Sequence, residues 1–121
     1  MLKISPKEDK LIAKKCGCEN VNVLMCDEDG VEKGYIAFTQ NGYVVEIVGF
    51  EVYFCEKLEG ESLIIADTLV KALGSYAMNH SCFYIECSKK ELYSMFEKFP
   101  FSLKENKMTV TLAQLFKVCK N

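Results

Sequence analysis

The first pattern along the chain is that of a short amphipathic helix. Ser5 can cap this helix, Pro6 suits its first turn, and Glu8 completes a capping box. Apolar residues then recur on one face as far as Cys16, and Gly17 can end the helix. We therefore expect this segment to be helical.

The pattern changes after Gly17 to that of strands. Three segments rich in β-branched and aromatic residues are separated by turn residues, which predicts an antiparallel meander. The expected strands span residues 21–26, 34–39 and 43–54. The dipeptide Asn41-Gly42 is the strongest hairpin signal in the chain. Gly49 interrupts the third strand, and a glycine inside a strand indicates a bulge or a close approach of another group.

The spacing of apolar residues then lengthens to three and four. Residues 62–79 carry apolar side chains on one face and polar ones on the other, which predicts the longest helix. The short apolar segment 82–87 predicts a buried strand. The remaining expected elements are a helix opened by a Ser88–Glu91 capping box and stopped by Pro100, a hairpin of strands 101–103 and 107–110, and a short helix capped by Thr111 with apolar residues from Leu112 to Cys119.

The order of these elements predicts the architecture. Strand 43–54, helix 62–79 and strand 82–87 form a right-handed βαβ unit, in which the two strands are parallel. The meander before them is antiparallel, so we expect a mixed sheet in an α+β domain with α/β character. The length of 121 residues, without a linker or a repeat, favours one domain over residues 1–121.

Composition narrows the range of partners. Half of the residues are hydrophobic, which excludes a disordered chain. The 15 basic and 17 acidic residues give a net charge of −2, which leaves no basic excess for a nucleic acid. No apolar run approaches the roughly 18–20 residues of a membrane span, and no signal segment is evident. We therefore expect a cytoplasmic protein without a nucleic-acid or membrane partner.

The seven cysteines are the unusual feature of the composition. Several lie in apolar runs, where a free cysteine behaves as a small hydrophobic residue. The pair Cys16 and Cys18, and His80 two residues before Cys82, do not match the spacing of a structural zinc site. We expect reduced, mostly buried thiols and no bound metal.

Four blocks of sequence, taken in order, resemble one known family. They are Gly34–Phe38 (GYIAF), Val45–Val52 (VEIVGFEV), Ala72–His80 (ALGSYAMNH) and Leu92–Phe101 (LYSMFEKFPF). Their order and spacing over about residues 21–103 are similar to those of the GNAT N-acetyltransferases. The family has a further strand and two helices before the meander, so the resemblance implies a short member that lacks these first elements.

The resemblance implies a site for acetyl-CoA between the fourth and fifth strands of the family fold. There the two strands part at a bulge, for which Gly49 is suitably placed. The pantetheine arm pairs with the exposed backbone of the fourth strand, which corresponds here to the segment with Phe50 and Val52.

The resemblance also implies a pyrophosphate loop of pattern Q/R-x-x-G-x-G/A at the start of the long helix, where free N–H groups attract an anion. Lys57, Gly60 and Ser62 match this loop in one alignment, and a second alignment places it at residues 61–66. In both alignments Glu56, Glu59 and Glu61 surround the loop. Carboxylates there repel a pyrophosphate.

The resemblance further implies a general base and a general acid. The base is often a glutamate on the fourth strand, and Glu46 and Glu51 are the candidates. Their odd separation puts them on opposite faces of a regular strand, whereas a bulge at Gly49 changes this. The acid is often a tyrosine in the last block, where Phe96 stands here, and Tyr93 one helical turn earlier is the substitute.

Two functions follow as hypotheses. The first is transfer of an acetyl group from acetyl-CoA to the amine of a small molecule or a protein. The second is a catalytically inactive GNAT fold that serves as a binding or dimerisation module, in which an apolar surface left bare by the missing first elements pairs two copies.

Overall fold

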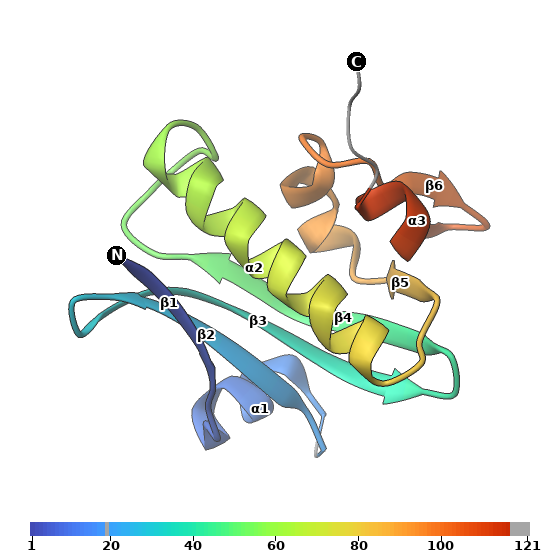
Figure 1. The fold of residues 1–121 in the computed structure, drawn as a ribbon, viewed down its shortest axis with the longest axis horizontal. Helices are drawn as coiled ribbons and strands as arrows, with labels where there is room; N and C mark the ends of the chain where they lie inside the picture. The colour runs from blue at the N-terminus through green and yellow to red at the C-terminus, as the bar shows by residue number, and fades with distance from the viewer. Residues whose placement is uncertain (19, 117–121) are drawn as a thin grey trace.

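Seven strands form one mixed sheet in the computed structural model, which describes residues 1–18 and 20–116 (Figure 1). The strands are β1 (Leu2–Pro6), β2 (Asn22–Glu28), β3 (Val31–Asn41), β4 (Val44–Val52), β5 (Tyr84–Cys87), β6 (Ser102–Lys104) and β7 (Lys107–Thr111). The helices are α1 (Lys10–Cys16), α2 (Glu61–Asn79), the 3₁₀-helix η1 (Lys90–Phe96) and α3 (Leu112–Leu115).

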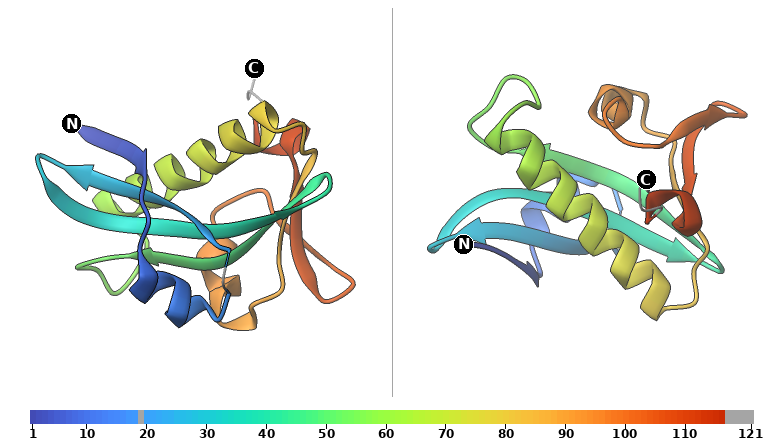
Figure 2. Two further views of the ribbon diagram at one scale, coloured as in Figure 1. Left: turned by 90° about the horizontal axis from the view of Figure 1, so that it is seen from below. Right: turned by 45° about the horizontal axis from the view of Figure 1, so that its top comes forward.

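The strands lie in the order β1-β2-β3-β4-β5-β7-β6. Only β4 and β5 are parallel, and every other neighbouring pair is antiparallel. This confirms the mixed sheet and the central βαβ unit β4-α2-β5. Helix α2 covers one face of the sheet and α1 lies on the opposite face, as the left view of Figure 2 shows.

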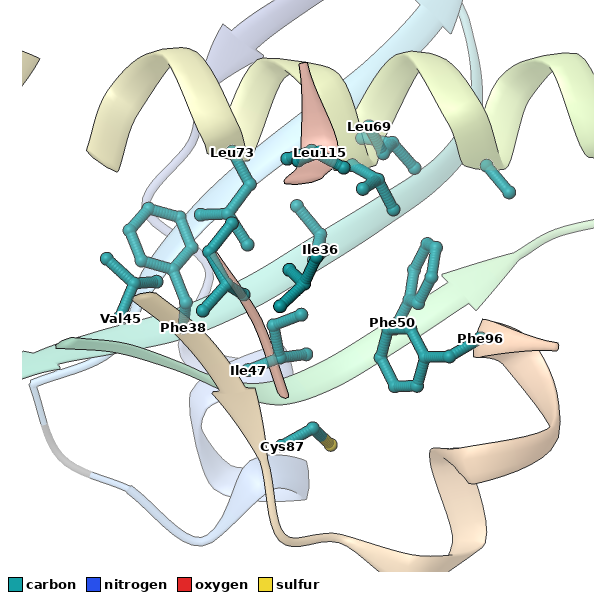
Figure 3. Close-up of a cluster of buried hydrophobic side chains, with 14 of the residues drawn as sticks. Ile36, Phe38, Val45, Ile47, Phe50, Leu69, Leu73, Cys87, Phe96 and Leu115 are labelled. Carbon is teal, nitrogen blue, oxygen red and sulfur yellow. The ribbon is translucent and has the colours of Figure 1, made fainter. Parts of the chain in front are cut away.

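The α2 face holds the larger hydrophobic core. Ile65, Leu69, Leu73 and Ala77 of α2 are at most 3% exposed, which confirms the apolar stripe. They pack with fully buried side chains of β3 and β4, among them Ile36, Phe38, Val45 and Ile47 (Figure 3). Burial of each such side chain contributes roughly 1.5–3 kcal/mol, so this core accounts for much of the stability of the fold.

A smaller core lies on the α1 face. Ile12 and Cys16 of α1 pack with Val23, Tyr35 and Val48 of the sheet. Tyr35 is only 3% exposed although it carries a hydroxyl group. The core on the α1 face is therefore the smaller of the two, and it includes the buried hydroxyl group of Tyr35.

The N-terminal helix is present and ends at Gly17 as predicted, but its predicted start at Ser5 was wrong, because α1 begins at Lys10. Residues Leu2–Pro6 form the edge strand β1 instead, and Asp9 caps α1 by accepting hydrogen bonds from the N–H groups of Leu11 and Ile12, both at 3.0 Å. The reason is the two-residue alternation of Leu2 and Ile4, which pack against the α2-face core. Pro6 is compatible with this strand because β1 pairs only with β2.

The second capping box, at Ser88–Glu91, is also absent. The hydroxyl of Ser88 donates a hydrogen bond to the carboxylate of Glu46 at 2.7 Å, and the following turn is the 3₁₀-helix η1, which has no side-chain cap. The capping box of the last helix is confirmed, since Thr111 and Gln114 bond to each other's backbone N–H groups. Cys119, expected on that helix, lies outside the described residues.

The hairpin at Asn41-Gly42 is confirmed, because β3 ends at Asn41 and β4 begins at Val44. No helix in the described part of the chain is long and apolar enough to cross a membrane.

Candidate active site

β4 and β5 are paired along only part of their length. Val44–Glu46 pair with Tyr84–Glu86, and β5 then ends at Cys87 while β4 continues to Val52. Within the described residues, no strand pairs with Ile47–Val52 on the side away from β3. The backbone of this second half of β4 therefore presents an open edge.

A bulge lies at the start of the open half of β4. Ala37 of β3 pairs with Gly49 and the next residue, Phe38, pairs with Ile47, so Val48 is the extra residue. A side chain at Gly49 has no room, because its Cβ atom would lie 2.7 Å from the Sγ atom of Cys16. The bulge predicted near Gly49 is thus present one residue earlier, and close packing on α1 explains the glycine.

A groove of ≈ 670 Å³ runs along the open half of β4. Its walls come from β4, from the loop that follows β4, and from η1; Phe50, Val52, Leu58 and Met95 supply apolar side chains. The rings of Phe50 and Phe96 face each other with centroids 5.7 Å apart (Figure 3). An extended ligand could therefore lie against the open backbone of β4 on apolar walls.

A smaller cavity of ≈ 230 Å³ lies toward α1, next to the bulge. Phe50 and Glu51 line both this cavity and the groove. The Nζ atom of Lys15 on α1 donates to a carboxylate oxygen of Glu51 at 2.9 Å, and that of Lys89 donates to the carbonyl of Cys16 at 3.2 Å. The end of α1 is thus tied to β4 and to the segment after β5.

The loop between β4 and α2 is folded onto the start of the helix. The hydroxyl of Ser62 bonds to the carbonyls of Lys57 and Glu59, each at 2.8 Å, and accepts a bond from the N–H of Glu59 at 3.0 Å. Gly60, the residue before α2, has a φ of 59°, which favours glycine. No side chain of a described residue caps the helix, which leaves N–H groups of its first turn without a capping partner, and Glu61, Ser62 and Ile65 line a hollow of ≈ 450 Å³ at this end.

Charges around the hollow are mostly acidic. Glu56 and Glu59 line both spaces and Glu61 lines the hollow, against Lys33 and Lys57. None of these five side chains forms an ion pair with another described residue. An anion at the start of α2 therefore meets free N–H groups and two lysines, but also three carboxylates.

No protein-family profile and no curated protein sequence matches the chain. Solved structures do match it. A GNAT family N-acetyltransferase from Escherichia coli in complex with CoA is 15% identical, with a TM-score of 0.60 over 97% of this chain and 86% of that one. A GNAT family acetyltransferase from Elizabethkingia anophelis with acetyl-CoA bound is 12% identical, with a TM-score of 0.62 over 91% and 96%. The IAA acetyltransferase from Bacillus cereus ATCC 14579 is 12% identical, with a TM-score of 0.61 over 92% and 99%.

The chain has the GNAT fold. The resemblance in its sequence blocks thus corresponds to a shared architecture. The expectation that the family's first elements are missing is wrong in part, because β1 and α1 precede the meander. The strand is present and a single helix follows it.

The bulge places both candidate bases of this GNAT fold on one face of β4. Ile47 and Phe50 pack in the α2-face core, whereas Val48 packs in the α1-face core, so Glu46 and Glu51 on either side of the bulge both face α1. Glu51 lines the groove and the smaller cavity. Glu46 lines neither space and accepts the hydrogen bond from Ser88.

Tyr93 lies apart from the other candidate residues. Its hydroxyl donates to the carbonyl of Asn106 at 2.7 Å, in the turn between β6 and β7, and it lines neither the groove nor the smaller cavity. Phe96 is fully buried between Phe50 and Phe101. The structure therefore brings Phe50, Glu51, Val52 and Lys57 together around the groove and leaves Tyr93 outside it.

The thiols have different environments. Cys16, Cys26, Cys82 and Cys87 are buried, as expected, whereas Cys55 is exposed at the groove. Burial raises the pKa of Cys87, the last residue of β5, to about 11, so this thiol is uncharged near neutral pH. No group of three or more possible metal ligands occurs in the part of the chain that the structure describes.

Sequence reasoning missed Tyr35 and Lys15 as residues of the site. Tyr35 lies directly opposite Glu51 in the β3–β4 register and lines the smaller cavity. Burial, with the charge of Glu51, raises the pKa of Tyr35 and keeps it protonated. The register of the hairpin could have indicated Tyr35 only if the position of the bulge had been known, and no local signal indicates that Lys15 reaches β4.

Proposed function

We propose that this chain binds acetyl-CoA along the open half of β4 and transfers the acetyl group to a primary amine. The observation that carries the proposal is the unpaired backbone of Ile47–Val52 beside a groove of ≈ 670 Å³. Related support comes from solved structures of the same fold, which hold CoA or acetyl-CoA.

The groove fits the pantetheine part of the cofactor. Amide groups of an extended ligand can pair with the open backbone near Phe50 and Val52, as an added strand does. Lys57 and the first N–H groups of α2, with Gly60 and Ser62 shaping the loop, would hold the pyrophosphate. When bound, the cofactor supplies an activated acyl thioester.

Glu51 is the residue that we assign as general base. It lines both the groove and the smaller cavity, so an amine in that cavity is within its reach. Glu46 is at the paired end of β4 and is engaged by Ser88, so we assign it a supporting role in holding the segment after β5.

Departure of the thiol does not require a side-chain acid at position 96. Thiols are far more acidic than water or alcohols, with a pKa of about 8.5 for the cysteine side chain, so a thiolate is a good leaving group without protonation. Tyr35, which stays protonated beside Glu51, is a hydrogen-bond donor at the smaller cavity. We therefore do not assign Tyr93 the role of general acid, since its hydroxyl donates a hydrogen bond to the carbonyl of Asn106.

We further propose a small amine, or the end of a lysine side chain, as the acceptor, because the cavity beside Glu51 has a volume of only ≈ 230 Å³. A cytoplasmic location and self-association as a homodimer remain part of the proposal. Sedimentation at high micromolar concentration tests the dimer, since a monomer alone would contradict it.

A non-catalytic binding module is the second candidate. The acidic groups around the start of α2 and the buried phenylalanine at position 96 favour it. Calorimetric titration with acetyl-CoA, followed by a thiol-release assay with a panel of primary amines, separates the two. Binding with thiol release supports transfer, and binding without release under every amine supports the module. No heat at millimolar ligand would contradict acetyl transfer and would support a module that has lost the cofactor site.

A further inference from the structure

Lys15 occupies the position that the proposed function gives to an acceptor amine. Its Nζ atom lies 2.9 Å from Oε1 of Glu51, and both side chains line the cavity beside the bulge. A general base must lie within about 2.6–3.2 Å of the group whose proton it takes, and this distance satisfies that range.

The side chain of Lys15 is held at its base by α1 and at its tip only by the ion pair with Glu51. It extends from the last turn of α1, and 65% of its side-chain surface is exposed. A lysine has a long, flexible stem, so its amine can move within the cavity without any change in the backbone. The backbone of α1 is fixed at the same point, because the carbonyl of Cys16 accepts the bond from Lys89.

Three other lysines of the described chain, Lys14, Lys7 and Lys107, serve as a comparison. Lys14 is the neighbour of Lys15 on α1 and is exposed, but it forms no ion pair with a described residue. Lys7 pairs with Glu32, and Lys107 pairs with Glu86 at 3.5 Å, but neither lines the groove or the cavity next to it. Only Lys15 among these combines a carboxylate partner with a place at the bulge.

We propose that Lys15 is an internal acceptor, which the chain acylates on itself from an acyl thioester held in the groove. This inference rests on the proposed function, since it uses the same base and the same groove. Effective concentration favours the reaction, because the amine is part of the chain that holds the thioester.

The reaction moves one acetyl group from the sulfur of the thioester to the nitrogen of Lys15. The ion pair with Glu51 raises the pKa of Lys15, so the ammonium is the resting form near neutral pH. After the ammonium gives one proton to Glu51, which passes it to solvent, the freed amine attacks the thioester carbonyl. A nitrogen–carbon bond forms, the carbon–sulfur bond breaks, and a second proton from the nitrogen goes to the departing thiolate. The products are Nε-acetyl-lysine at position 15 and a free thiol. The amide is neutral, so the ion pair with Glu51 cannot re-form.

The test is peptide mass spectrometry of the pure, folded chain after incubation with acetyl-CoA, and separately with a small acetyl thioester that lacks the nucleotide. Lys15 is expected to be acetylated at least about tenfold faster than Lys14, Lys7 and Lys107. The half-time should not depend on protein concentration, because the reaction occurs within one chain. Urea-unfolded protein gives the chemical background, in which the four lysines should react alike.

Two variants test whether the fast acetylation depends on Glu51 and on the amine of Lys15. Glu51→Gln is expected to slow acetylation of Lys15 by about tenfold and leave Lys14 unchanged. It removes a general base, which contributes about 10²-fold, but also the charge that raises the pKa of Lys15. Lys15→Arg keeps the ion pair and should abolish the fast modification. Circular dichroism confirms that both variants fold, because both positions are partly exposed.

Equal rates at Lys14 and Lys15, or no effect of Glu51→Gln, would overturn the inference. Calorimetry on the same sample separates it from the proposed function. If acetyl-CoA binds and Lys15 does not react, the proposed function stands and the internal acceptor is wrong. If acetyl-CoA does not bind but the small thioester still modifies Lys15 selectively, the internal acceptor stands and the proposed cofactor is wrong.

Discussion

The two halves of β4 bury their side chains to a similar extent, but they differ in the number of strands with which their backbone pairs. In the first half, Val45 is fully buried and the backbone pairs with β3 and β5. In the second half, Phe50 and Val52 are 4% and 7% exposed, yet the backbone pairs with β3 alone. Side-chain burial and backbone pairing are therefore separate features of this strand.

The difference shows how a small sheet can keep an open edge without losing its core. Burial on α2 and β3 holds the second half of β4 in place, so a ligand can use the free N–H and carbonyl groups. An exposed strand edge usually invites aggregation. Here η1 and the loop before α2 form the walls of the groove beside the edge, and they limit access to it.

The largest expected effect on stability comes from truncating Phe96, whose ring packs on Phe50 in the open half of β4. Phe96→Ala should destabilise the fold by about 3–5 kcal/mol, because Phe96 is fully buried against Phe50 and Phe101. Urea denaturation measures this loss. Phe96→Leu is the control and should lose clearly less. A loss below about 1 kcal/mol for Phe96→Ala would mean that Phe96 does not support the open half.

The bulge can be tested by adding one methyl group. Gly49→Ala should cost about 1–3 kcal/mol, because its Cβ atom would lie 2.7 Å from the Sγ atom of Cys16. Cys16→Ala in the same chain removes this clash, so the double variant should lose less than the sum of the two single variants. Strict additivity in the urea midpoints would argue against the contact.

A matched pair of valines compares the two halves directly. Val45→Ala should cost about 2 kcal/mol, since the side chain is fully enclosed between paired strands. Val52→Ala should cost about 1 kcal/mol, because the groove beside it allows neighbours and water to relax into the space. Equal losses in thermal or urea unfolding would contradict the difference between the halves.

The smallest expected effect is on the affinity for acetyl-CoA, and it comes from the charge of Glu59 in the loop after the open half. Glu59→Gln should tighten binding of acetyl-CoA roughly two- to fivefold, because a carboxylate at the start of α2 competes with an anion. The gain should shrink at high salt. Glu8→Gln, on an exposed residue outside the groove, is the control in the same calorimetric titration. Weaker binding by Glu59→Gln would show that Glu59 does not face the anion.

Local sequence patterns were sufficient for most of the fold. The periods of α2 and of the meander, the hairpin at Asn41-Gly42 and the cap at Thr111 are all present because burial and turn geometry there depend on neighbouring residues. They failed at Ser5 and Ser88, where the competing partner is distant in sequence. β1 depends on β2 and the α2-face core, and Ser88 bonds to Glu46.

The candidate site was predictable only as far as β4 and the loop after it. A bulge near Gly49 was expected, and it accounts for the placement of Glu46 and Glu51 on one face. Lys15 and Tyr35 could not be assigned, because their positions depend on how α1 packs on the sheet and on the register between β3 and β4. Contacts of this kind leave no local signal in a single sequence.

The central claim is that the open half of β4 is the ligand-binding edge. Nitrogen-15 labelled protein titrated with CoA tests it residue by residue through backbone amide resonances. The account predicts saturable shifts at Phe50, Glu51 and Val52 and at the start of α2, with little change at Val44 and Val45. Shifts confined to other parts of the chain, or none at millimolar CoA, would contradict it.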